Sequence, residues 1–204
     1  MKFNAGFTCI ILTFLLIACS KNQTSFYKDV EDPGLAIFSN TQNNIMTCYA
    51  NGRAWRTGNR IAYSGWGGGT IYEIYINKNT TTSLYDTIVI AWDGNWESST
   101  NSDSRISLTL PIAKSFPKSF NELEGKRLVF DTTQGFYSTS MGVFNGQTNK
   151  GWGSIYFQNA HIESVGPNNF RGKMAGLFEA HFSTDEITRG RFDHSINDGN
   201  LIIY

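Results

Sequence analysis

Two segments close together in the chain, YDTIVIAW at 85–92 and RISLTL at 105–110, decide the fold class. The second alternates apolar and polar residues, so that Ile106, Leu108 and Leu110 fall on one side of an extended chain. The first is rich in β-branched and aromatic residues, and its unbroken apolar centre, IVIAW, is typical of a strand covered on both faces. Both segments therefore predict β-strands.

The same two-residue periodicity extends along the chain in both directions. Asn51-Gly52 separates two short extended segments and is a strong hairpin signal, because both residues tolerate a positive φ. Only residues 118–124 have the pattern of a helical turn. Further strands are predicted at residues 46–50, 53–56, 71–76, 127–131, 136–144, 154–163, 170–182 and 187–193.

This pattern predicts an all-β domain, an antiparallel β-sandwich of about nine or ten strands separated by Gly, Asn and Ser turns. Mostly short connections favour antiparallel pairing, because parallel strands need long crossovers. The connection at 111–125 is long enough to cross between two sheets, which favours the sandwich. A small lipocalin-like β-barrel is the alternative.

Composition excludes several classes of protein. The 204 residues include 17 basic and 17 acidic side chains, and 14% of the residues are aromatic. Charged residues are too few and aromatic residues too many for a disordered chain. Because a nucleic-acid binder needs a basic face, the balanced charge indicates no nucleic-acid partner.

The N-terminus has the pattern of a secretory signal. Lys2 supplies a positive charge, and the apolar stretch at 7–18 is too short to span a bilayer comfortably. Leu16-Ile17-Ala18-Cys19 resembles the lipobox of bacterial lipoproteins. The resemblance implies cleavage before Cys19, transfer of a diacylglycerol group to its thiol and acylation of the new amino terminus, with palmitate as a typical acyl chain. Several acyl chains anchor a protein firmly, since each buried methylene contributes about 0.8 kcal/mol.

These signals divide the chain into three parts: a signal peptide at 1–18, a lipidated N-terminus and flexible tether at 19–44, and a single all-β domain at 45–204. Within the tether, residues 35–38 have the composition of a short strand that could dock on the domain. Ser20 is not the aspartate that the resemblance associates with inner-membrane retention, which implies the outer membrane, with the domain facing the periplasm or the cell surface.

Cysteine usage points to no internal disulfide. Cys9 leaves with the signal peptide and Cys19 carries the lipid, so that Cys48 has no partner. Cys48 lies in a mostly apolar run and is expected to be a small buried hydrophobe rather than a catalytic thiol.

A second resemblance lies in the mature domain. Asn51-Gly52-Arg53-Ala54-Trp55, the segment at 170–178 and Ile187-Thr188-Arg189-Gly190-Arg191-Phe192-Asp193 are similar to motifs of bacterial envelope lipoproteins without an established activity. The similarity covers about half the chain and implies the same fold and location. It brings no catalytic residues with it.

A search for catalytic and metal sites yields no enzyme and no cofactor. The histidines have no metal-ligand spacing, although a site assembled across strands stays open: His161, His181 and His194. Residues 93–103 are rich in oxygen ligands for calcium but lack the order of an EF-hand loop. Glu122 and Glu124 would share one face of a strand, which does not supply the two sides of a glycosidase cleft. Residues 65–69, GWGGG, lack the lysine of a phosphate-binding loop.

The tryptophans are the residues with the strongest binding potential. Trp92 lies inside the apolar segment and is expected in the core. Four others lie near expected turns or strand ends: Trp55, Trp66, Trp96 and Trp152. Such rings either plug the ends of a sandwich or present apolar faces to a sugar or a protein. The expected function is a lipid-anchored, non-catalytic binding module for a glycan or a partner protein, with a structural or assembly role in the envelope as the alternative.

Overall fold

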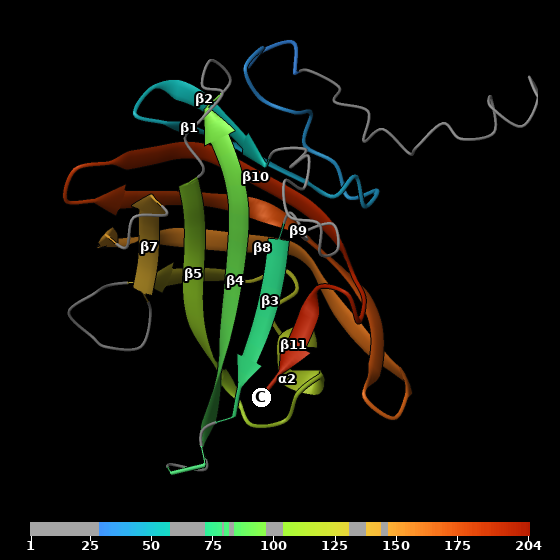
Figure 1. Cartoon of the computed structure of the whole chain (residues 1–204). Coiled ribbons are helices and arrows are strands. Elements are labelled where there is room, and N and C mark those ends of the chain that lie inside the picture. Colours follow the sequence, from blue (N-terminus) through green and yellow to red (C-terminus); the bar gives the residue numbers. More distant parts are fainter. Residues whose placement is uncertain are drawn as a thin grey trace, which may run out of the picture.

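The computed structural model describes residues 29–57, 72–78, 80–81, 84–96, 104–130, 138–143 and 147–204, with the backbone alone between 138 and 150. Eleven strands and one short helix lie in these ranges (Figure 1). They are β1 (Ile45–Ala50), β2 (Arg53–Thr57), β3 (Tyr72–Asn77), β4 (Tyr85–Trp96), β5 (Ser104–Ala113), α2 (Lys118–Asn121), β6 (Arg127–Phe130), β7 (Ser138–Val143), β8 (Gln147–Gly166), β9 (Asn169–Phe182), β10 (Glu186–Ile196) and β11 (Leu201–Ile203).

The strands form one sheet in the order β11-β3-β4-β2-β1-β10-β9-β8-β7-β5, with β6 attached to β8. Among these pairings only β11 with β3 is parallel. The prediction of an all-β, mostly antiparallel domain is confirmed. An additional pairing of β4 with β5 turns the path back on itself, and the sheet curls into a half-barrel. This arrangement is nearer to the barrel alternative than to a sandwich of two separate sheets, because hydrogen bonding continues from one layer into the other.

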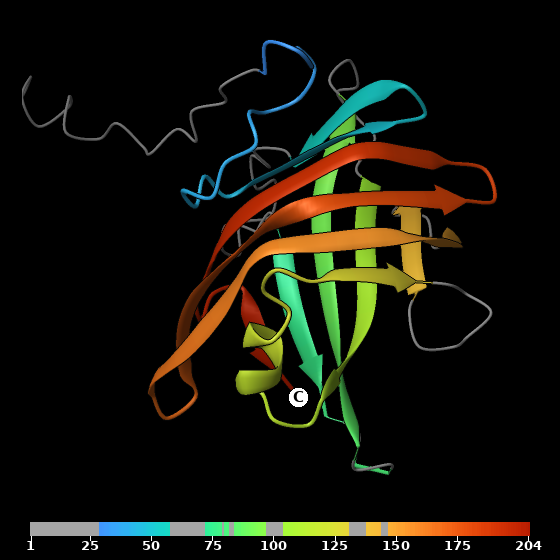
Figure 2. The ribbon, with the colours of Figure 1, turned by 180° about the vertical axis from the view of Figure 1, so that it is seen from behind.

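The core lies between two layers of this curled sheet. Strands β3, β4 and β5 form one layer, and β8, β9 and β10 cross behind it (Figures 1 and 2). Trp92 of β4 is fully buried, as predicted, and stacks on Phe178 of β9 with ring centroids 5.5 Å apart. Phe192 of β10 packs on the same indole at 5.6 Å. Aromatic pairs in this geometry add to the stabilisation that burial alone supplies.

Two local predictions are confirmed by the backbone. Asn51 and Gly52 have φ angles of 52° and 71° and join β1 to β2, which pair from Ala50 and Arg53 onward. Helix α2 begins at Lys118, and its Phe120 is buried against Phe157 of β8 at one end of the half-barrel (Figure 2).

The structure differs from the expectations at the sequence Gly151-Trp152-Gly153. This tripeptide lies inside β8 and not at a turn before it. Gly153 permits close approach of the neighbouring strand, since a Cβ at this position would lie 2.0 Å from the carbonyl oxygen of Glu179 on β9. Glycine is therefore needed at position 153 for packing.

Candidate functional site

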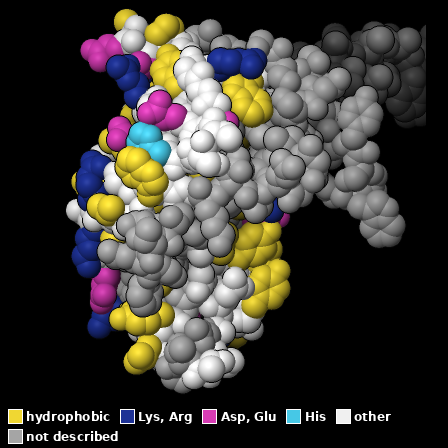
Figure 3. Space-filling model, turned by 90° about the vertical axis from the view of Figure 1, so that its left-hand side faces the viewer, with side chains coloured by type: hydrophobic (Ala, Val, Ile, Leu, Met, Phe, Trp, Pro, Cys, Tyr) yellow, Lys and Arg dark blue, Asp and Glu magenta, His cyan; other side chains and the backbone are white. Residues whose placement is uncertain are grey.

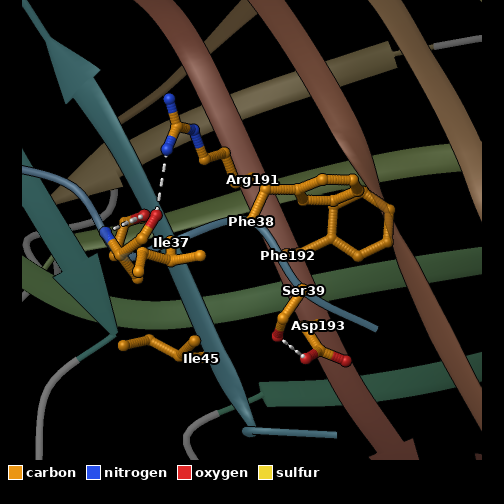
Figure 4. Close-up of a pocket in the computed structure, with 9 residues that line it drawn as sticks. Ile37, Phe38, Ser39, Ile45, Arg191, Phe192 and Asp193 are labelled. Carbon is orange, nitrogen blue, oxygen red and sulfur yellow. Dashed lines mark hydrogen bonds between the residues drawn. The ribbon is translucent and has the colours of Figure 1, made fainter. Parts of the chain in front are cut away.

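Residues 29–44, named here the N-terminal strap, pack against β1 and β10 (Figure 4). This differs from the expectation of a flexible tether through residue 44. Leu35 is fully buried, and Ala36 forms an isolated β-bridge and donates its backbone N–H to the Thr47 hydroxyl of β1. The strap therefore belongs to the folded domain, and residues 19–28 of the expected tether lie outside the described residues.

Two arginines of β10 hold the beginning of the strap. Arg191 donates to the carboxylates of Asp29 and Asp32 and, at 3.0 Å, to the carbonyl oxygen of Ala36. Arg189 also donates to Asp32. The hydrogen bond from Arg191 is the main cause that lowers the pKa of Asp29 below its usual value. Charge-assisted hydrogen bonds of this kind are stronger than neutral ones.

A single buried carboxylate holds the end of the strap. Asp193 of β10 is only 3% exposed and accepts hydrogen bonds from Ser39 Oγ and from the backbone N–H groups of Thr41, Gln42 and Asn43, at 2.9–3.2 Å for the backbone groups. Successive N–H groups that converge on one anion form a nest. Figure 4 shows Ser39 directed at this carboxylate. The shallow pocket between the strap and β10 has room for about one water molecule, so it is no ligand site.

Polar groups continue from the strap into the interior of the half-barrel. Asn44 Oδ1 accepts from the backbone N–H and the hydroxyl of Ser195, both at 2.8 Å. Ser195 in turn accepts, through its carbonyl oxygen, from Tyr72 Oη and Asn200 Nδ2. This network joins the strap to β10, β3 and the turn before β11.

His194 lies at the centre of the interior, fully buried between strands β3, β4 and β10. Its Nε2 accepts from Trp92 Nε1 at 2.7 Å, and its ring stacks on Tyr72 with centroids 4.0 Å apart. Burial lowers the pKa of His194 to about 3, so the imidazole is neutral at physiological pH. Its Nδ1 has no hydrogen-bond partner among the described residues. The His194 imidazole therefore packs in the core as a neutral ring.

The outer face of β6, β8 and β9 carries the most exposed tryptophan that the structure describes. Strand register places its outward side chains in three rows: Trp152 beside His181, Val129 beside Ser154 and Glu179, and Arg127 beside Tyr156 and Leu177. We name these eight residues the outer platform. Figure 3 views a face of the molecule on which hydrophobic side chains alternate with basic and acidic ones.

Within the outer platform, Trp152 is 56% exposed and its orientation is held by neighbours. Its indole stacks on His181 with centroids 4.2 Å apart and planes 20° apart. His181 Nδ1 lies 3.3 Å from the carboxylate of Glu186 on β10. In the third row, Arg127 donates to Ser154 Oγ at 3.0 Å, and its guanidinium lies 5.9 Å from the ring centroid of Tyr156.

The structure brings two of the predicted tryptophans, Trp55 and Trp96, together on paired strands and places Trp152 apart from them. Trp55 is fully buried, and its Nε1 donates to Ser104 Oγ at 2.6 Å, so it belongs to the core. Trp96 is partly buried opposite Trp55 on β4. Trp152 faces outward on β8, and three strands separate β8 from β2 in the sheet. Trp66 lies outside the described residues.

The other candidates from the sequence are also accounted for. Asp93 pairs with Arg105, and residues 97–103 of the calcium segment lie outside the described residues, as does the segment at 65–69. Glu124 accepts from the backbone N–H of Ala160, and Glu122 caps α2, so these two do not share a strand face.

Within the described ranges, no three side chains of His, Cys, Asp or Glu are grouped as metal ligands. Cys48 is buried and free, and burial raises the pKa of its thiol, as expected of a buried hydrophobe.

The sequence predicted that residues 35–38 could dock on the domain, and the buried Leu35 and the β-bridge at Ala36 confirm it, but sequence reasoning missed the docking of the rest of the strap. The sequence signal for this docking is complementary charge, since the acidic residues at 29–32 are opposite in charge to the two arginines of the segment at 188–191.

Comparison with protein-family models, curated proteins and solved structures finds no match to this chain. Among the described residues, no helix is long and apolar enough to cross a membrane. The function is therefore inferred from the geometry of the strap and of the outer platform.

Proposed function

We propose that the protein is a lipid-anchored, non-catalytic binding module of the bacterial outer membrane, tethered through acylated Cys19. The docked strap is the observation that carries the proposal, because it limits the link between the anchor and the docked chain to the ten residues 19–28. Ten residues span at most about 35 Å when fully extended and about 17 Å as a flexible coil. The domain thus stays next to the membrane that holds the lipid.

The placement of charges supports a mechanical role for the strap. A link pulled from its lipid end transmits force first to Asp29 and Asp32, which are bound to the arginines of β10, a strand inside the sheet and not at its edge. Asp193 then holds the far end of the strap. Such an attachment fixes the strap on the domain, which suits a module that presents a binding face to the outside or to the periplasm.

The anchoring is tested in a Gram-negative host that expresses the full chain and receives an alkyne-tagged fatty acid. We expect labelling of the wild type and of Cys48→Ala, and loss of the label with retention of the uncleaved precursor in Cys19→Ala. The Cys48 variant is the matched control, since this cysteine is buried in the core. Normal labelling of Cys19→Ala would overturn the proposal.

Binding is tested separately by cross-linking in intact cells and recovery of the tagged protein from detergent extracts. We expect no protein that stays bound at a fixed stoichiometry through detergent extraction, because a binding module for a glycan or a partner protein captures and releases its ligand. A stable complex with another envelope protein would instead favour the structural or assembly role and would remove the binding module.

A further inference from the structure

We propose that the docked strap closes a seam between β3 and β10, and that release of the strap opens this seam onto the buried His194. The seam begins where the pairing of β1 with β10 ends, at Ile45 opposite Asp193. On its other side lies the first residue of β3, Tyr72. The inference goes beyond the proposed function, because it concerns the domain itself and needs no lipid.

Side chains take the place of a neighbouring strand at Ser195 of β10. In an antiparallel sheet the N–H and the C=O of one residue point to the same side, and those of Ser195 point into the seam. Asn44 of the strap accepts from the N–H and from the hydroxyl of Ser195, both at 2.8 Å. Tyr72 and Asn200 donate to the carbonyl oxygen of Ser195. Side chains from three parts of the chain therefore hold the seam together.

The docked strap sets the position of Asn44. The three residues before it, 41–43, donate their backbone N–H groups to Asp193. Gln42 and Asn44 have φ angles of 65° and 54°, so the chain turns sharply between these hydrogen bonds and the seam. When the strap leaves Asp193, Asn44 leaves Ser195, whose N–H and hydroxyl then lose their acceptor. A buried donor without an acceptor is costly, so water enters and the seam opens.

His194 lies directly behind the seam and reports its opening. Its fully buried ring stacks on Tyr72 with centroids 4.0 Å apart. Because Nε2 accepts from Trp92, the neutral ring carries its proton on Nδ1, and this donor has no acceptor among the described residues. Water that enters the seam supplies one. An open seam therefore gives a reagent in solution access to a ring that the closed seam excludes.

The test measures the acylation of His194 by diethyl pyrocarbonate in the full chain in detergent micelles. Mass spectrometry locates and times the reaction, with the exposed His161 as internal reference. Gln42→Pro cannot keep a φ of 65° and removes an N–H that binds Asp193, so it releases the strap without changing β10. Gln42→Gly keeps both features and is the matched control. Asn44→Gly keeps the positive φ and removes the side chain that enters the seam.

We expect His194 to react about tenfold faster or more in Gln42→Pro and in Asn44→Gly than in the wild type, because each variant removes hydrogen bonds that oppose opening. Gln42→Gly should react like the wild type. Hydrogen exchange should show residues 41–43 freed in Gln42→Pro while residues 174–178 of β9 stay protected, which separates opening of the seam from unfolding of the domain.

Three outcomes would overturn the inference. The first is a wild-type rate for His194 in Gln42→Pro although residues 41–43 exchange freely. The second is a wild-type rate in Asn44→Gly, which decides the question alone if Gln42→Pro leaves the strap docked. The third is loss of protection in β9 together with the reaction of His194, since the domain would then open as a whole. Each of these results leaves the acyl label on Cys19 untouched, so the proposed function would stand.

Discussion

The role of Asp193 gives the sharpest prediction on the strap. Replacing Asp193 with alanine removes the acceptor for three backbone N–H groups and one hydroxyl. Hydrogen bonds to a charged group are worth about 1.5–3 kcal/mol each when the donor is left buried. Thr41 and Gln42 are exposed, however, so water replaces the carboxylate there. We therefore expect a loss of about 2–3 kcal/mol in the free energy of opening the strap.

Hydrogen exchange followed by mass spectrometry measures this opening directly. A loss of 2–3 kcal/mol corresponds to exchange about 30- to 150-fold faster for the amides of residues 41–43 in Asp193→Ala. Asp198→Ala is the matched control, since Asp198 is exposed and accepts a single backbone N–H, that of Phe170. Unchanged exchange rates of the strap amides in Asp193→Ala would refute the inference that this carboxylate holds the end of the strap.

Three further predictions concern stability. For His194 the folded-state pKa lies below the ordinary value of 6.5, so the unfolded state binds a proton that the folded state does not. The free energy of unfolding should therefore fall as pH drops from 6.5 toward 3. In His194→Phe, chemical denaturation should show a smaller decrease of this free energy with falling pH. Asp29 also has a depressed folded-state pKa, because Arg191 stabilises its charged form. The protection of the strap amides against hydrogen exchange should therefore weaken as pH falls below 3.8. Protection that increases with acid would contradict this. Gly153→Ala should lower the free energy of unfolding by about 2–3 kcal/mol, because the added Cβ overpacks the contact with β9. Gly166→Ala should lower it by less than about 0.5 kcal/mol, since its new Cβ meets nothing closer than 3.7 Å. Thermal unfolding measures both, and equal losses would contradict the packing argument.

Part of the candidate site could be predicted from sequence and part could not. The sequence marks Trp55 and Trp152 alike, as large rings near glycine or asparagine. The structure buries Trp55 against Ser104 and exposes Trp152 on His181. Which face of a strand is buried depends on the curvature and pairing of the whole sheet, and these come from partners more than forty residues away in the case of Trp55.

The sequence alone determined the local elements of this protein. Alternation at 105–110 and the Asn51-Gly52 turn are set within a few residues, because side-chain direction reverses at each position of a strand and few residues tolerate a positive φ. Only the tertiary structure decided the pairing of β1 with β10 and the docking of the strap on Asp193. These contacts join residues far apart in the chain, and their free energy exists only once the sheet has curled and excluded water from the carboxylate.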